Sequence, residues 1–196
     1  MAVTDRSPTG DAYFEETWAT GDDPWDHAGR WYEQRKYGLT VAALPRARYE
    51  RSFEPGCGAG VLTRLLASRS AGHLAMERHP RGVQATAARC EDLPQVEVRL
   101  GTLPDDWPTG TFDLIVLSEI LYYLDRAGIA ETLDRGRRSL TPGGHLVAVH
   151  YRPEVDAHAW NGDEVHDRLR AAPGWLAGTQ IVDPEFVLDV FHLATS

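Results

Sequence analysis

An acidic residue followed by closely spaced glycines is the segment of this chain best suited to hold a small ligand. The segment reads EPGCGAG and spans residues 54–60. Glycine allows tight turns and lets a ligand approach the backbone closely. A dinucleotide-binding GxGxxG motif would need a glycine at position 61, where the chain has Val61. The carboxylate of Glu54 would also repel a pyrophosphate, so the pattern favours a ligand that carries positive charge.

The elements that must position this segment follow from hydrophobic periodicity. Strands are predicted at 51–54, 73–77, 96–100, 112–118 and 145–151. Helices are predicted between them at 61–68, 82–88 and 125–139. Strands that alternate with helices indicate βαβ units and a mostly parallel sheet covered on both faces. In such a sheet, ligands bind beyond the carboxyl ends of the strands.

The C-terminal part of the chain has a different pattern. LTPGG at 140–144 predicts the end of a helix and a turn into the fifth strand. A helix is predicted at 161–173, followed by strands at 175–182 and 186–193 that a short turn joins. Two strands connected so closely pair antiparallel. The predicted fold class is therefore α/β: a single Rossmann-like fold with a mostly parallel seven-stranded sheet, a C-terminal antiparallel hairpin and helices on both faces.

The N-terminal region divides into two parts. Residues 1–22 show no periodicity and are interpreted as a flexible lead or lid. A helix is predicted over 23–45, with Asp23 as its cap, Pro24 at its first position and Pro45 at its end. Its face, which includes Trp25, Tyr32 and Arg35, is assigned to packing. We expect one catalytic domain over residues 23–196.

Composition excludes several classes of partner and site. The net charge is −9, and the basic residues are dispersed, which argues against nucleic acid and against an anionic membrane surface. No apolar run approaches the ~20 residues of a membrane span, and the acidic N-terminus is unlike a secretory signal, so a cytoplasmic protein is expected. Two cysteines, Cys57 and Cys90, make neither a disulfide framework nor a zinc site, and no metal is expected.

The EPGCGAG segment resembles motif I, (D/E)xGxGxG, of class I S-adenosylmethionine-dependent methyltransferases. The resemblance extends over about residues 25–196 and includes Glu77 after the second strand, FDLIVLSEILYYL at 112–124 and LTPGG. It implies S-adenosylmethionine as cofactor and S-adenosylhomocysteine as product, with Glu77 bound to the ribose hydroxyls. Where the family often has aspartate after the third strand, this chain has Gly101 and Thr102, so the adenine contacts would use the backbone and Thr102. The expected cofactor residues are Glu54, Gly56, Cys57, Gly58, Gly60, Glu77, Arg78, Gly101, Thr102, Leu103 and Ser118.

A closer likeness concerns the residues on either side of motif I. DPWDHAGRWYEQRKYGLTVAALP at 23–45 and SEILYYL at 118–124 resemble the NodS-like nodulation methyltransferases, which methylate the free amine of a chitooligosaccharide. This likeness implies transfer of a methyl group to a small-molecule acceptor, an amine nitrogen such as that of an amino sugar. The alternatives are a small-molecule O- or C-methyltransferase, a cofactor-binding protein without catalysis, and a nucleotide-dependent dehydrogenase, which Val61 disfavours. A monomer or a homodimer is expected.

Residues that follow the fourth and fifth strands are the candidates for catalysis. An amine must lose a proton before it attacks, and a general base contributes typically ~10²–10⁴-fold. Glu119 and His150 are the predicted bases, because both lie at strand ends on the rim of the expected cleft. Tyr122 and Tyr123 are adjacent and are expected to point to different sides. The predicted substrate contacts are Tyr122, Tyr123, Tyr151, Arg152 and His158.

Overall fold

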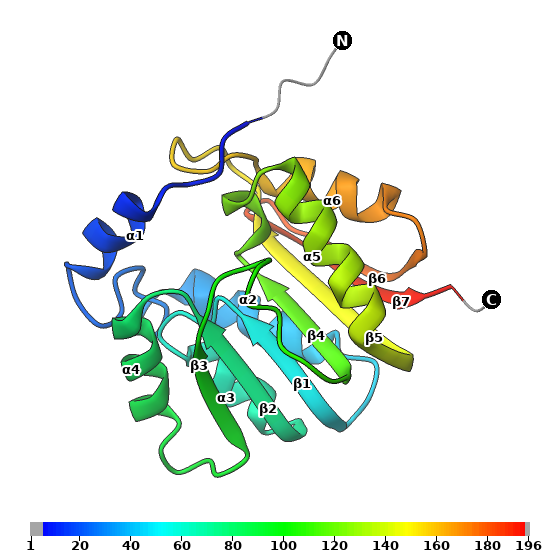
Figure 1. Cartoon of the computed structure of the whole chain (residues 1–196), viewed down its shortest axis with the longest axis horizontal. Coiled ribbons are helices and arrows are strands. Elements are labelled where there is room, and N and C mark those ends of the chain that lie inside the picture. The colour runs from blue at the N-terminus through cyan, green and yellow to red at the C-terminus, as the bar shows by residue number, and fades with distance from the viewer. Residues whose placement is uncertain (1–5, 195–196) are drawn as a thin grey trace.

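A seven-stranded mixed sheet forms the centre of the molecule. The structure is a computed structural model and describes residues 6–194 (Figure 1). The strand order is β3-β2-β1-β4-β5-β7-β6. Strands β1 to β5 are parallel to one another, whereas β7 is antiparallel to both β5 and β6. The strands are β1 Tyr49–Pro55, β2 Ser70–Glu77, β3 Val96–Leu100, β4 Phe112–Ser118, β5 Leu140–Tyr151, β6 Trp175–Val182 and β7 Phe186–Leu193. The predicted fold class, including the C-terminal hairpin, is confirmed.

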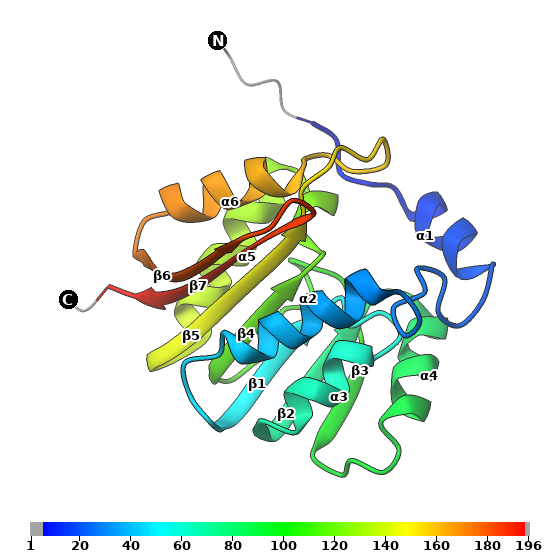
Figure 2. The same ribbon diagram turned by 180° about the vertical axis from the view of Figure 1, so that it is seen from behind.

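Helices cover both faces of the sheet. They are α1 Asp11–Trp18, α2 Trp31–Ala42, α3 Val61–Ala67, α4 Pro80–Arg89, the 3₁₀ turn η1 Leu121–Tyr123, α5 Arg126–Ser139 and α6 Gly162–Ala171. Helices α5 and α6 lie in front of the sheet in Figure 1, and α2 and α3 lie in front of it when it is seen from behind in Figure 2. The central strands therefore need apolar side chains on both sides.

The core residues of β4 show how one strand serves both faces. Ile115 and Leu117 belong to the cluster that includes α5 and α6, whereas Leu114 and Val116 belong to the cluster that includes α2 and α3. Successive side chains of a strand point to opposite faces, so a continuous apolar run fills both. All four side chains are fully buried. The sheet is thereby held rigid between two cores, and its strand ends provide fixed positions for a site.

The predicted N-terminal helix begins later than expected. Asp23 accepts hydrogen bonds from the backbone N–H groups of His27 and Ala28, both at 2.9 Å, and so closes a turn instead of capping a helix. Asp26 adopts a left-handed conformation with φ of 55°, which a continuous helix does not allow. The helix starts only at Trp31. The predicted packing face, counted from Trp25, is therefore wrong.

A helix occupies the segment expected to lack regular structure. Residues 1–5 of that segment lie outside the described residues, but α1 forms at 11–18 and places Trp18 in a fully buried position. The Trp18 ring stacks on His79 with ring centroids 5.5 Å apart. A Cβ atom on Gly82 would come within 2.7 Å of the same indole, so glycine at this position lets Trp18 seat. Figure 1 shows α1 at the end of the sheet toward which the parallel strands point.

One other boundary also differs from the predictions, namely the start of β5. LTPGG does not form a free turn, because Leu140 already pairs with Phe112 and β5 runs from 140 to 151. The register shifts between Phe112 and Leu114, so this irregular start of the strand concealed the pairing.

Within residues 6–194, every helix is too short or too polar to cross a membrane.

Candidate active site

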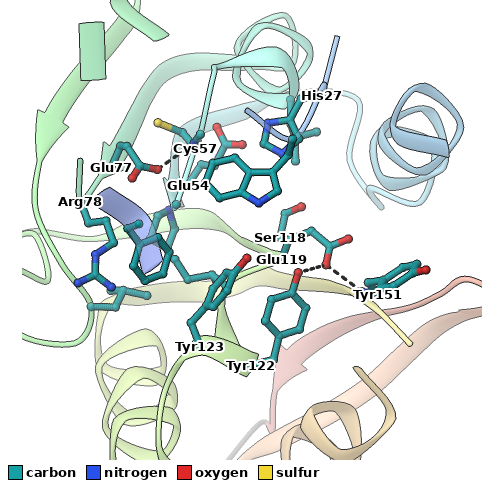
Figure 3. A pocket seen from close by; sticks show the side chains of 18 of the residues that line it. His27, Glu54, Cys57, Glu77, Arg78, Ser118, Glu119, Tyr122, Tyr123 and Tyr151 are labelled. Carbon is teal, nitrogen blue, oxygen red and sulfur yellow. Dashed lines mark hydrogen bonds between the residues drawn. The ribbon is translucent and has the colours of Figure 1, made fainter. Parts of the chain in front are cut away.

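A cavity of about 290 Å³ lies at the carboxyl ends of the parallel strands (Figure 3). Its floor comes from the ends of β1, β2 and β4 and from the loop after β3, and its roof comes from α1, the segment before α2 and α2 itself. This is where a sheet of this topology binds its ligands. Most of the predicted residues line it: Glu54, Gly56, Cys57, Gly58, Glu77, Arg78, Gly101, Thr102, Leu103, Ser118, Glu119, Tyr122, Tyr123, Tyr151 and His158.

The glycine segment needs its glycines for backbone reasons. Gly56, Gly58 and Gly60 have φ values of 71°, 57° and 78°, which residues with a side chain rarely adopt. A Cβ on Gly58 would also lie 2.9 Å from Cε1 of His27. Gly60 caps α3 and is not among the lining residues, because its position faces the backbone of Thr86. Of the three glycines, Gly56 and Gly58 therefore line the cavity, and Gly60 shapes the turn behind it.

Glu77 joins the second strand to the glycine segment. Its Oε2 accepts the backbone N–H of Gly58 at 3.0 Å, and its Oε1 accepts the N–H of His79 at 3.1 Å. Burial raises the pKa of Glu77, while the hydrogen bonds from the His79 and Gly58 N–H groups favour the carboxylate and oppose that rise. Each oxygen keeps one lone pair free for a ligand in the cavity. The residue is both a ligand candidate and a structural link.

Glu54 and Cys57 are held mainly by the protein. The Glu54 carboxylate is 2% exposed and accepts from the hydroxyl of Thr63 at 2.7 Å. Nε2 of His73 lies 3.1 Å from the same oxygen. Burial raises the pKa of the Cys57 thiol well above its ordinary value, as the negative charge of Glu77 also does. Cys57 is therefore a packing residue of the loop and no nucleophile.

Glu119 collects four hydrogen bonds at the end of β4. Its Oε1 accepts from Lys36 Nζ at 2.5 Å and from Tyr32 OH at 3.1 Å. Its Oε2 accepts from Tyr122 OH at 2.6 Å and from the Tyr151 N–H at 2.8 Å. In Figure 3 Tyr122 and Tyr151 converge on this carboxylate. Glu119 also has a φ of 55°, a strained conformation of the kind found at functional sites.

These partners make Glu119 a poor base. Burial alone raises the pKa of Glu119, but the positive charge of Lys36 and the hydrogen bonds from Lys36 and Tyr122 outweigh it and bring the pKa to about 2. A carboxylate with this pKa and with its lone pairs occupied does not take a proton at neutral pH. The structure thus differs from the prediction: Glu119 lies in the site but orients the rings around it.

His150 lies behind the cavity wall, not at its rim. It is fully buried and is not among the lining residues. Its Nε2 accepts the backbone N–H of Leu121 at 3.2 Å, so its proton must be on Nδ1, which lies 3.0 Å from Nε2 of His166. His166 Nδ1 in turn donates to Asp189 at 2.6 Å. His150 is therefore unsuitable as the predicted base; it belongs to a buried chain that supports η1.

Among the predicted substrate contacts, some residues line the cavity and one points away from it. Arg152 points out of the site, since its guanidinium pairs with Asp163 at 2.9 and 3.1 Å. Tyr122 and Tyr123 both line the cavity, with ring centroids 4.8 Å apart, although they were expected to point to different sides. Neighbouring side chains of a 3₁₀ turn differ by ~120°, unlike the 180° of a strand.

Sequence reasoning missed the roof of the cavity. The side chains that it contributes are aromatic or charged: Tyr13, Phe14, Trp25, His27, Arg30, Tyr32, Glu33 and Tyr37. The sequence pattern assigns Trp25 and Tyr32 to packing, but both line the cavity; the third residue of that face, Arg35, pairs with Asp183 outside it. The high density of aromatic residues between positions 13 and 37 is the sequence feature that could have indicated this roof.

Comparisons with known proteins agree on one family. A model described as a methyltransferase domain matches residues 53–146. A putative methyltransferase of known structure from Pseudomonas syringae is 38% identical, covers 83% of this chain and 99% of its own, and has a TM-score of 0.74. Nodulation protein S of Rhizobium tropici is 30% identical over 128 residues, which are 64% of this chain and 54% of that protein. This chain thus spans about half the length of that curated relative.

A second solved structure is similar in fold. N-methyltransferase NodS from Bradyrhizobium japonicum WM9, in complex with S-adenosyl-L-homocysteine, has a TM-score of 0.82 and covers 94% of this chain and 98% of its own. At 23% identity this likeness shows the fold alone.

The buried histidine chain predicts how stability changes with pH. Burial, reinforced by the neighbouring His166, lowers the pKa of His150 well below 6.5. As the pH falls below about 6.5, His150 therefore becomes protonated in the unfolded chain but stays neutral in the folded chain. The free energy of unfolding consequently decreases as the pH drops below that value. We expect urea titrations of His150→Gln to show a shallower loss of unfolding free energy between pH 7.5 and 5.0 than the original protein. His192→Gln, at an exposed position of β7, is the control; equal slopes for all three proteins would contradict the assignment.

Proposed function

This chain belongs to the class I S-adenosylmethionine-dependent methyltransferase family, and we propose that it transfers a methyl group from S-adenosylmethionine to an amine nitrogen of a small molecule. One observation carries the choice of acceptor. The cavity is lined by four carboxylates, Glu33, Glu54, Glu77 and Glu119, against the two guanidinium groups of Arg30 and Arg78. The buried ammonium of Lys36, which is paired with Glu33 and Glu119, reduces the excess to one negative charge. A cavity with this excess of negative charge and aromatic walls favours cationic ligands.

The half of the cavity next to β1 and β2 fits the cofactor. Gly56 and Gly58 line this half of the cavity with their backbone, and the free lone pairs of Glu77 suit the hydrogens of ribose hydroxyls. Gly101 and Thr102 line the adjoining wall, where we expect the adenine. S-adenosylmethionine, when bound, supplies an electrophilic methyl group on a positively charged sulfur. The protein has to orient the acceptor in line with that methyl group and exclude competing water.

The half of the cavity beyond β4 fits the acceptor. The hydroxyl groups of Tyr32 and Tyr122 and the backbone N–H of Tyr151 converge here on the Glu119 carboxylate. Tyr32 and Tyr151 are packed edge to face with centroids 5.5 Å apart. The faces of such rings attract an ammonium ion, and Glu119 adds a permanent negative charge behind them. An amino sugar fits this description, because it offers both an ammonium group and an apolar ring face.

The first prediction concerns the choice of cofactor. We expect S-adenosylhomocysteine and S-adenosylmethionine to bind in calorimetric titrations and NAD to give no heat, since Glu54 and Val61 disfavour a pyrophosphate at the glycine segment. Binding of NAD without a response to either sulfur compound would contradict the proposal.

The second prediction concerns Glu77. Glu77→Gln places an amide N–H against one of the two backbone donors, so the dissociation constant for S-adenosylhomocysteine should rise by ~10–100-fold, the scale of a lost hydrogen bond to a charged group. Glu97→Gln, at an exposed position of β3, is the matched control and should bind as the original protein does. A lower melting temperature for Glu77→Gln with unchanged affinity would mean that Glu77 is only structural.

The third prediction concerns the acceptor. A screen of amines, phenols and carboxylates with labelled S-adenosylmethionine should label amines, and the rate should rise with pH because only the free base has a lone pair. Labelled phenols with inert amines would favour an O-methyltransferase. Cofactor binding with no labelled acceptor of any kind would favour a binding protein without catalysis.

A further inference from the structure

The proposed amine methylation leaves one group unassigned, namely the acceptor of the amine proton. Most aliphatic amines are protonated at neutral pH and cannot attack in that form. Neither predicted base is available, since Glu119 has a pKa of about 2 and His150 is enclosed in a buried chain. The cavity must therefore use another group, or rely on acceptor that has already lost its proton in solution.

Two imidazoles line the cavity, and they lie in different halves. His27 is stacked on Trp25 with ring centroids 5.5 Å apart and faces Gly58. Its Nδ1 lies 3.6 Å from the carboxylate of Asp23. His27 thus belongs to the cofactor half. His158 lies in the other half, between β5 and α6, where its backbone N–H donates to the carbonyl of Val155 at 2.9 Å.

The ring of His158 is held in place but not hydrogen-bonded. It stacks on Tyr122 with centroids 3.9 Å apart and an interplanar angle of 12°, and the edge of Tyr123 meets it at 4.8 Å. Within residues 6–194, neither ring nitrogen has a hydrogen-bond partner. This contrasts with His73, His150 and His166, whose ring nitrogens all have partners. The stack on Tyr122 fixes the plane of the imidazole while leaving its nitrogens free for a ligand.

We propose that His158 is the general base that takes the proton from the acceptor ammonium. The inference rests on the proposed function. In this step an N–H bond of the ammonium breaks and a bond from the same hydrogen to a ring nitrogen of His158 forms. The lone pair left on the amine nitrogen then forms the bond to the methyl carbon, and the electron pair of the sulfur–methyl bond stays on sulfur, which becomes neutral. Because His158 is half-buried, its proton passes on to solvent.

The surroundings of His158 keep the imidazole neutral before the reaction. Burial lowers the pKa of His158 to about 4, against the negative charge of Glu119, which raises it. The groups that face it are the Tyr122 and Tyr123 rings of η1, Glu119 after β4 and His150 at the end of β5. Burial disfavours the charge of an ammonium beside His158 in the same way, and the Glu119 carboxylate favours both charged forms, so these groups shift the pKa values of donor and acceptor in the same direction.

The decisive measurement is the pH profile of His158→Gln, taken with an amine that the original protein methylates. At pH 7 we expect kcat to fall by ~10²–10⁴-fold, the usual contribution of a general base. The deficit should shrink as the pH approaches the pKa of the amine, since the free base then needs no catalyst. Affinity for S-adenosylhomocysteine should stay unchanged. His192→Gln, far from the cavity on β7, should keep the original profile.

A second variant guards against simple misfolding. His158→Ala leaves space beside Tyr122, and added imidazole should restore part of its activity if the ring acts as a base. A deficit that is equal at all pH values and is not rescued by imidazole would overturn the role of His158 while leaving amine methylation intact. An original protein that methylates no amine at any pH would overturn the proposed function and this inference with it.

Discussion

The ion pair between Lys36 and Glu119 is the interaction on which the arrangement of the site depends. Lys36 is the only lysine of the chain, and its side chain is fully buried. An ammonium ion removed from water costs several kcal/mol unless it is paired and hydrogen-bonded. Here Nζ lies 2.8 Å from Glu33 and 2.5 Å from Glu119, and the rings of Tyr32 and Tyr37 lie 4.7 and 5.0 Å from it. The positive charge of Lys36 is therefore balanced by two carboxylates and two aromatic rings, and these groups come together only in the folded chain.

Because Glu119 has four donors from different elements, it determines how those elements meet. Lys36 and Tyr32 come from α2, Tyr122 comes from η1, and the N–H of Tyr151 comes from the end of β5. From the other side, the chain of His150, His166 and Asp189 supports the backbone of η1 at Leu121. The aromatic walls of the cavity are therefore held by buried polar bonds, whose loss leaves unpaired groups and is costly. This explains why so polar a cluster can be rigid enough to orient a substrate.

Under the proposed function, the two halves of the cavity use acidic residues for different purposes. On the cofactor side, Glu77 binds backbone N–H groups and keeps lone pairs free for a ligand. On the acceptor side, Glu119 accepts hydrogen bonds from four groups of the protein and contributes charge and ring orientation. A carboxylate that lies close to a bound ammonium group is therefore not necessarily the group that removes its proton. The unpaired imidazole of His158, stacked on Tyr122, is better suited to that task.

The sequence by itself determined the strands and helices, the glycine turn and most of the residues that line the cavity next to β1 and β2, because each of these depends on local features. Alternating runs of apolar residues predict strands and helices, and positive φ values at Gly56 and Gly58 require glycine. Only the tertiary structure decided which acceptor-side residues face the cavity. Lys36 and Glu119 are 83 residues apart, and His150 and His166 are 16 apart, so no local pattern shows that they meet. The same reason applies to Trp25 and Tyr32, whose place in the roof depends on a turn at Asp26 that interrupts an otherwise helical pattern.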